Sequence, residues 1–128
     1  FETDKPTVRI IDAGANIGMA ILYFKFLFPD CSILAFEPNP DAFHLLQKNV
    51  KDNQLENVQL ENKALSDEEG TLTLFLNENK GSLVASMRMD RGGNESVSIP
   101  SKKLSAVLKK ERFDLLKMDI EGAEVKVI

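Results

Sequence analysis

Residues 8–18 read VRIIDAGANIG, and this stretch decides the fold of the chain. Its first five residues form a mostly β-branched run that ends in an acid, which predicts a short strand. Gly14 then allows a tight turn, because glycine adopts positive φ without strain. The mostly apolar segment 19–28 follows and stops at Pro29, which predicts a helix. We therefore expect a strand, a glycine turn and a helix in that order.

The same alternation of strand and helix continues along the chain. Asn39 is suited to cap a second helix, with Pro40 at its first position. Segment 71–76 has a strand-like pattern and should pair antiparallel with 96–99, and Ser101 should cap a short third helix. The remaining strands are expected at 32–36, 57–62 and 113–119. We expect an α/β fold with a mostly parallel sheet, helices on both faces and one antiparallel strand pair.

The length and composition indicate the number of domains and argue against several classes of protein. The 128 residues suffice for one domain, 1–128, with one hydrophobic core. The net charge is −4 with no block of Lys or Arg, so we expect no nucleic-acid partner, and no segment has the length of a membrane span. Cys31 is the single cysteine and cannot form an internal disulfide, so we expect a cytoplasmic protein. His44 has no second histidine nearby, and we expect no metal site.

The glycine turn favours one cofactor over another. A dinucleotide fingerprint that begins at Gly14 needs two further glycines, and the chain has Asn16 and Met19 there instead. This counts against an NAD-dependent oxidoreductase, which stays the alternative enzyme class. S-adenosylmethionine has no phosphate, and its methionine end carries a carboxylate, an ammonium and a sulfonium. The turn suits the carboxylate, and Asp12 at the strand end suits the cationic groups.

The ends of the predicted strands collect the other candidate residues. In parallel sheets, ligands bind at the carboxyl ends of the strands. Glu37 follows the second strand, 23 residues after Gly14, and an acid there accepts both hydroxyls of a ribose. We expect one cleft to be formed by the segments 12–18, 37–39, 62–64 and 119–121.

Four stretches of the sequence resemble a known family. IIDAGANIG, AFEPNP, NKALSD and DLLKMDIEGAE look like the FkbM-type S-adenosylmethionine-dependent methyltransferases and follow one another in the same order. The resemblance implies a Rossmann-like class I methyltransferase fold that methylates a hydroxyl on a sugar, glycan or secondary metabolite. It also implies further strands after DIEG, so we expect the chain to be a fragment without the C-terminal strands. A non-catalytic remnant that only binds the cofactor is the third reading.

The resemblance also assigns residues to the cofactor. Five residues of the glycine turn would hold the methionine end: Asp12, Gly14, Ala15, Asn16 and Gly18. Glu37 would take the ribose, with Pro38 and Asn39 beside it. Asn62 and Ala64 would border the adenine.

Three residues near the last strand are the candidates for catalysis. Transfer of a methyl group to oxygen needs positioning and a base for the proton of the hydroxyl. Asp119 is the first candidate base and Glu121 the second, and the alternative roles are binding of substrate or helix capping. Lys117 lies on the same strand face as Asp119, and either pairs with one of these acids or reaches solvent. The loop 77–94 contains Met87, Arg88, Met89 and Arg91. We expect either that it lines the site for a small-molecule or glycan acceptor, or that it is a disordered, solvent-exposed loop.

Overall fold

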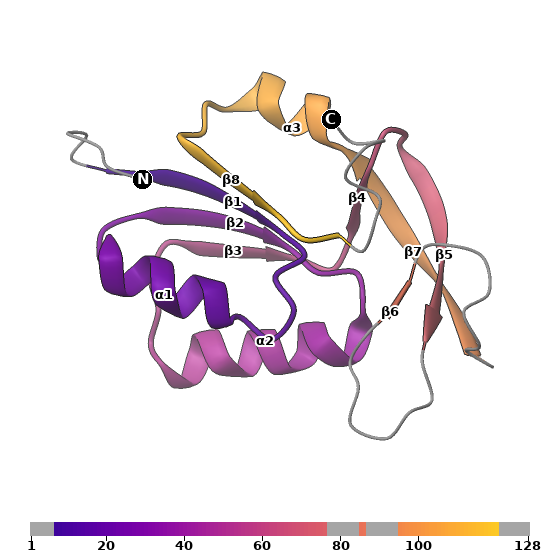
Figure 1. The fold of residues 1–128 in the computed structure, drawn as a ribbon, viewed down its shortest axis with the longest axis horizontal. Helices are drawn as coiled ribbons and strands as arrows, with labels where there is room; N and C mark the ends of the chain where they lie inside the picture. The colour runs from indigo at the N-terminus through magenta and orange to yellow at the C-terminus, as the bar shows by residue number, and fades with distance from the viewer. Residues whose placement is uncertain (1–6, 77–84, 87–94, 121–128) are drawn as a thin grey trace.

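A computed structural model describes residues 7–76, 85–86 and 95–120, which form two four-stranded sheets and three helices (Figure 1). The first sheet is parallel and has the order β3-β2-β1-β8. Its strands are β1 (Arg9–Ala13), β2 (Ser32–Phe36), β3 (Val58–Glu61) and β8 (Leu115–Met118). Within the described residues β8 is an edge strand, paired with β1 alone.

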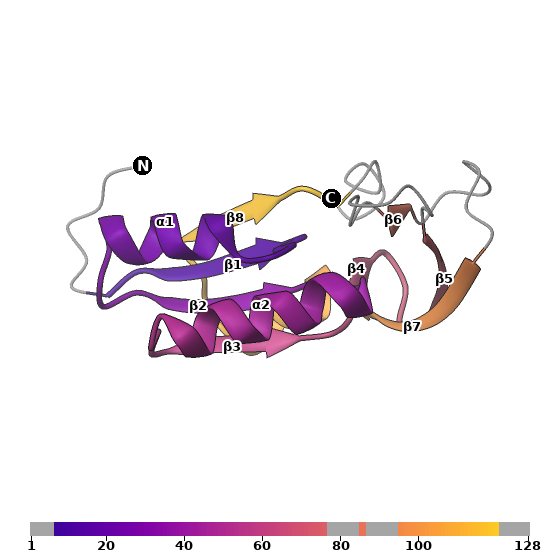
Figure 2. The ribbon, with the colours of Figure 1, turned by 90° about the horizontal axis from the view of Figure 1, so that it is seen from below.

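Helices cover both faces of the parallel sheet, as the sequence predicts. They are α1 (Met19–Leu27), α2 (Pro40–Asp52) and α3 (Leu104–Lys110). Figures 1 and 2 show α1 and α2 side by side along the sheet. Ile21 of α1 and Leu46 of α2 join the core on one face, whereas Val107 of α3 packs into a second core on the other. Neighbouring residues of β1 separate these two cores, since Ile10 belongs to the first and Ile11 to the second.

The cap of α2 confirms the sequence prediction. Asn39 accepts hydrogen bonds at Oδ1 from the backbone N–H groups of Asp41 and Ala42, and Pro40 is the first helical residue. The cap predicted at Ser101 is wrong, because α3 begins only after Lys103. Ser101 lies inside β7, where it pairs with strands on both sides, and its hydroxyl donates to the carbonyl of Glu68.

The second sheet contains the predicted antiparallel pair. Its order is β4-β7-β5-β6, with β4 (Ala64–Ser66), β5 (Gly70–Leu76), β6 (Ala85–Ser86) and β7 (Glu95–Lys103). β5 runs antiparallel to β7, with Leu72 opposite Ile99. The short strands β4 and β6 do not follow from the sequence pattern, because they are two or three residues long and exist through their partners.

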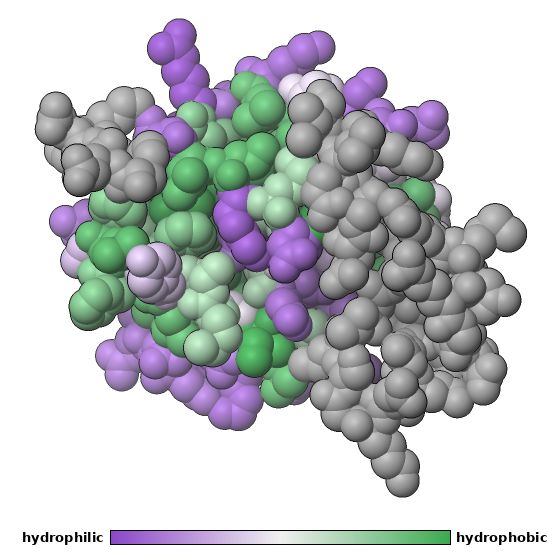
Figure 3. All heavy atoms as spheres, in the orientation of Figure 1, coloured by the Kyte–Doolittle hydropathy of each residue, from purple (hydrophilic) through white to green (hydrophobic). Residues whose placement is uncertain are grey.

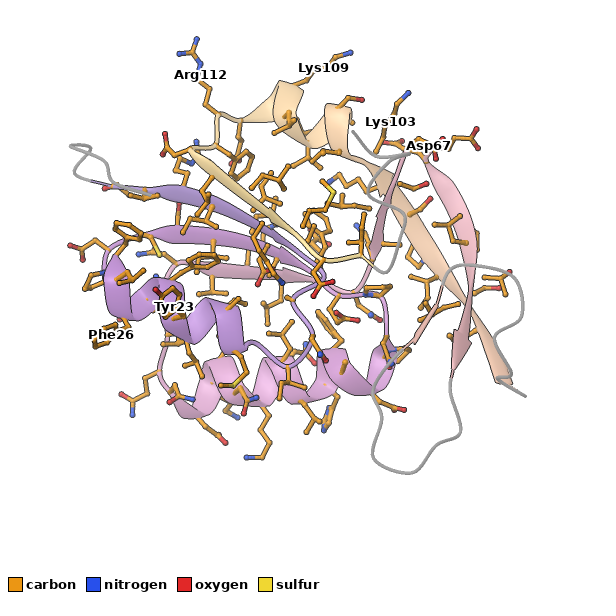
Figure 4. The ribbon with its side chains drawn as sticks, in the orientation of Figure 1. Tyr23, Phe26, Asp67, Lys103, Lys109 and Arg112 are labelled. Atoms are coloured by element: carbon orange, nitrogen blue, oxygen red, sulfur yellow. The ribbon has the colours of Figure 1, made fainter. Side chains whose placement is uncertain are left out.

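The outer side of α1 is apolar and exposed. Met19, Tyr23 and Phe26 are spaced along one side of the helix and are 65%, 60% and 81% exposed. Figure 3 shows hydrophobic surface over this helix, and Figure 4 shows Tyr23 and Phe26 directed away from the sheet. Cys31 is buried. No helix of the described residues is long and apolar enough to cross a membrane.

Candidate functional site

The carboxyl ends of the parallel strands lie together at one edge of the sheet. Backbone hydrogen bonds connect them: the N–H groups of Gly14 and Ala15 donate to the carbonyl of Phe36 at 2.9 and 3.0 Å. The N–H of Asp119 donates to the carbonyl of Ala13 at 2.9 Å, and the N–H of Glu37 donates to the carbonyl of Glu61. The structure thus brings together the four strand ends that the sequence selects.

Gly14 is required by close packing as well as by its backbone conformation. Its φ is +82°, and a Cβ at this position would lie 1.9 Å from the carbonyl oxygen of Asp119. Gly18 precedes α1 with a φ of +98°, and a Cβ there would lie 2.9 Å from Leu46 Cδ1. The turn therefore packs closely against the end of β8 and against Leu46 of α2, and its two glycines leave the backbone there without side chains.

Glu37 ties the first two strand ends together. It is 7% exposed, and its Oε2 accepts from the N–H of Asn16 at 2.7 Å while Oε1 accepts from the N–H of Asn39 at 2.9 Å. Burial raises the pKa of this carboxyl, and the two backbone hydrogen bonds act in the opposite direction. Each oxygen keeps a lone pair for a further donor, such as a hydroxyl.

Three more of the residues expected around the cofactor are Asn62, Ala15 and Ala64. Asn62 donates from Nδ2 to the carbonyls of Glu37 (2.8 Å) and Pro38 (3.2 Å), so its side chain holds the loop that follows β2. Ala15 is buried in the core on the α1 face. Ala64 is buried in the second sheet, where it packs with residues of β5 and β7, and its side chain lines that core.

Lys117 forms an ion pair across strands. It lies directly opposite Asp12 in the register of β8 and β1, with 2.9 Å between Nζ and Oδ1, and it donates to the carbonyl of Gly14 at 2.9 Å. Lys117 is the charged partner of this buried carboxylate, and Oδ2 has no hydrogen-bond partner among the described residues. Of the alternatives left open for Lys117, the ion pair with Asp119 is not formed, because the ammonium pairs with Asp12 across the strands. Glu121 lies outside the described residues.

The two members of this ion pair differ in exposure. Asp12 has no exposed surface, whereas the Lys117 side chain is 30% exposed. Burial raises the pKa of Asp12; the neighbouring ammonium of Lys117 lowers it, and the charge of Asp119 adds to the increase. Of the two side chains, only that of Lys117 reaches the surface.

A comparison with protein-family models shows which family the chain belongs to. The model of the methyltransferase FkbM domain matches residues 12–128. This chain belongs to the FkbM methyltransferase family. Methyltransferase sdnD of Sordaria araneosa is 37% identical over 151 residues, which cover 93% of this chain and 58% of that protein. The 2-O-methyltransferase NoeI of Sinorhizobium fredii is 27% identical over 142 residues, which cover 98% of this chain and 58% of that protein.

The fold comparison agrees with the family. The crystal structure of the methyltransferase FkbM from Methylobacillus flagellatus matches with a TM-score of 0.69 at 15% identity, covering 99% of this chain and 29% of that one. This confirms the predicted Rossmann-like class I methyltransferase fold. The chain spans 58% of the length of methyltransferase sdnD and 58% of the length of NoeI.

Asp119 lies at the mouth of the site in this FkbM domain. It follows the last residue of β8, its side chain is exposed, and its backbone carbonyl lies over Gly14. Its backbone is thus in contact with the glycine turn, and the residue is exposed. Glu121 and the loop residues Met87, Arg88, Met89 and Arg91 lie outside the described residues.

One site residue is missing from the sequence analysis. Asn49 of α2 donates from Nδ2 to the carbonyl of Ile17 at 2.7 Å and so supports the glycine turn from a different element. The signal was available, because Asn49 lies three residues after Leu46 on the apolar side of the helix. A polar residue at an apolar position of a helix often has a specific partner.

Proposed function

We propose that this chain is the cofactor-binding part of an S-adenosylmethionine-dependent O-methyltransferase. The observation that carries the proposal is the position of Glu37, whose carboxylate lies at the end of β2 and contacts both neighbouring loops. Its remaining lone pairs suit the two hydroxyls of a ribose. Membership in the FkbM family supports methyl transfer as the reaction.

The residues present fit this cofactor. The backbone at Gly14 carries no side chain, and the turn ends at the start of α1. Asn39 and Asn62 hold the loop after β2 in shape, which leaves a fixed wall for the nucleoside. When bound, S-adenosylmethionine supplies an electrophilic methyl carbon on its sulfonium.

The geometry of Asn16 counts against a dinucleotide. Its N–H is donated to Glu37 at 2.7 Å, and the N–H groups of Gly14 and Ala15 are donated to the carbonyl of Phe36. A pyrophosphate needs free N–H groups in this turn. The alternative of an NAD-dependent oxidoreductase is therefore disfavoured by hydrogen bonding as well as by the missing glycines.

The proposed acceptor is a hydroxyl on a small molecule or glycan. One relative in the family has a name that specifies a 2-O-methyltransferase. Asp119 is exposed beside the glycine turn, where a carboxylate is suited to take the proton from the hydroxyl oxygen. Its role is then general base, and Glu121 is the second candidate for that role.

Calorimetric titration tests the proposal directly. The protein should bind S-adenosylmethionine and S-adenosylhomocysteine, and NADH should give no heat of binding. A protein that binds NADH and neither methionine derivative contradicts the proposal. Transfer of a labelled methyl group to hydroxyl acceptors, assayed with the full-length protein, separates an enzyme from a remnant that only binds the cofactor.

A further inference from the structure

Most backbone donors of the glycine turn are already used within the protein. Four of the five N–H groups in residues 14–18 donate to protein oxygens, namely those of Gly14, Ala15, Asn16 and Gly18. An anion that approaches this turn therefore finds few free donors in it. The carboxylate of an amino-acid ligand needs a positively charged or N–H group from another element.

Lys117 supplies a positive charge beside the glycine turn. Its Nζ lies 2.9 Å from the carbonyl oxygen of Gly14, so the ammonium touches the turn itself. An ammonium has three N–H groups, and one points to Gly14 while another faces Asp12. At least one donor is left, and the side chain is 30% exposed.

Asp12 is placed to hold this ammonium and not to meet a ligand. Its carboxylate has no exposed surface and lies 2.9 Å from Nζ, directly across the strand pair. The fully buried acid fixes a lysine that would otherwise turn to solvent, because long lysine side chains otherwise extend their charge into water. The charge of Lys117 also acts to lower the pKa of Glu37, against the effect of burial.

We propose that Lys117 binds the methionine carboxylate of the cofactor and that Asp12 is the positioning residue that orients its ammonium. The inference rests on the proposed function and refines it, because it assigns the anionic end of the ligand to β8 instead of the glycine turn. Lys117 then determines specificity for ligands that keep the amino-acid part.

Two ligands that differ in the amino-acid end test the proposed contact between Lys117 and the carboxylate. S-adenosylhomocysteine and 5′-methylthioadenosine share the adenine and the ribose, but only the first has an amino-acid end. Lys117→Met should weaken S-adenosylhomocysteine binding about 10- to 100-fold, the effect of one charge-assisted hydrogen bond. Binding of 5′-methylthioadenosine should stay unchanged. The ratio of the two dissociation constants, measured by calorimetry, is therefore the readout, and a general loss of folding would move both constants together.

Two further variants keep the test decisive. The double variant Asp12→Asn/Lys117→Met leaves no unpaired buried charge and should show the same loss of preference. Lys109→Met removes an exposed lysine of α3 and should leave the ratio as in the wild type (Figure 4). An unchanged ratio in both Lys117 variants, or tighter binding of S-adenosylhomocysteine, overturns the inference. A wild-type protein that binds neither nucleoside contradicts the proposed function itself.

Discussion

Glu37 accepts a hydrogen bond from the backbone N–H of Asn16, with 2.7 Å between Oε2 and N. This bond joins the end of β2 to the turn after β1, so one carboxylate fixes the relative position of two loops. The same carboxylate is the proposed acceptor for the ribose. Its loss should therefore affect both the binding of the cofactor and the stability of the fold.

Glu37→Ala should weaken S-adenosylmethionine binding by about 1.5–3 kcal/mol, because it removes a charged acceptor for two hydroxyls. Glu37→Gln should have a smaller effect, since one acceptor oxygen remains. Titration calorimetry measures both, with Glu56→Ala, at an exposed position before β3, as the matched control. Equal affinity in Glu37→Ala and the wild type would refute the ribose assignment.

The stability contributed by Glu37 should fall as the pH rises. Burial raises its folded pKa above the ordinary value of 4.5, so between these two values the folded state binds more protons than the unfolded state. The free energy of unfolding of the wild type, relative to Glu37→Gln, should decrease as the pH increases through this window. Urea unfolding of both proteins at a series of pH values measures it. The opposite slope would mean that the backbone hydrogen bonds outweigh the burial.

Gly14→Ala should destabilise the protein by at least about 2 kcal/mol, because both a positive φ and a crowded site oppose the new methyl group. Its Cβ would lie 1.9 Å from the Asp119 carbonyl oxygen, so β8 or the turn has to move. Gly70→Ala is the matched control, since Gly70 also has positive φ but no atom within 4 Å of its Cβ position. Chemical unfolding compares the two, and equal losses would show that only the backbone conformation matters.

The Asp12–Lys117 pair should respond asymmetrically to substitution. Lys117→Met leaves a fully buried carboxylate without its cation and should cost about 3 kcal/mol, whereas Asp12→Asn leaves an ammonium that can turn to solvent and should cost less. The cost of Lys117→Met should shrink as the pH falls, because the raised pKa of Asp12 lets it become neutral. Unfolding curves of both variants at neutral and acidic pH test this. A larger loss in Asp12→Asn would contradict it.

Asp119→Asn should lower turnover by about 100- to 10,000-fold if this residue is the base. Affinity for the cofactor should change little, since the exposed carboxylate lies outside the hydrogen bonds that hold the two loops. Steady-state kinetics of the full-length protein at saturating cofactor gives the comparison, with Glu121→Gln as the second variant. Wild-type turnover in both would exclude base catalysis from this segment.

Local patterns in the sequence predict those features of the structure that depend only on residues close together in the chain. The turn at Gly14 and the cap at Asn39 depend on backbone conformation and neighbouring N–H groups, and both follow from the residues alone. Ser101 fails as a cap because β7 pairs with β4 and β5 at this residue. Hydrogen bonding between strands outweighs the local capping preference there.

The partner of Lys117 needs knowledge of the strand order. A lysine in an apolar strand indicates that its ammonium has a partner. Which residue is that partner depends on which strand lies beside it and in which register. β8 lies beside β1, and this register places Lys117 opposite Asp12. More than one hundred positions separate these two residues in the sequence, so the sequence pattern suggested only the nearby acids Asp119 and Glu121 as partners.

The loops at the proposed cofactor-binding edge are held by hydrogen bonds within the protein itself. Asn49 holds the carbonyl of Ile17, and Asn62 holds the carbonyls of Glu37 and Pro38. A nucleoside that enters such an edge has little backbone to order, so its association loses little conformational entropy. Binding should then proceed in a single fast kinetic phase, without a slow rearrangement of these loops after the first encounter.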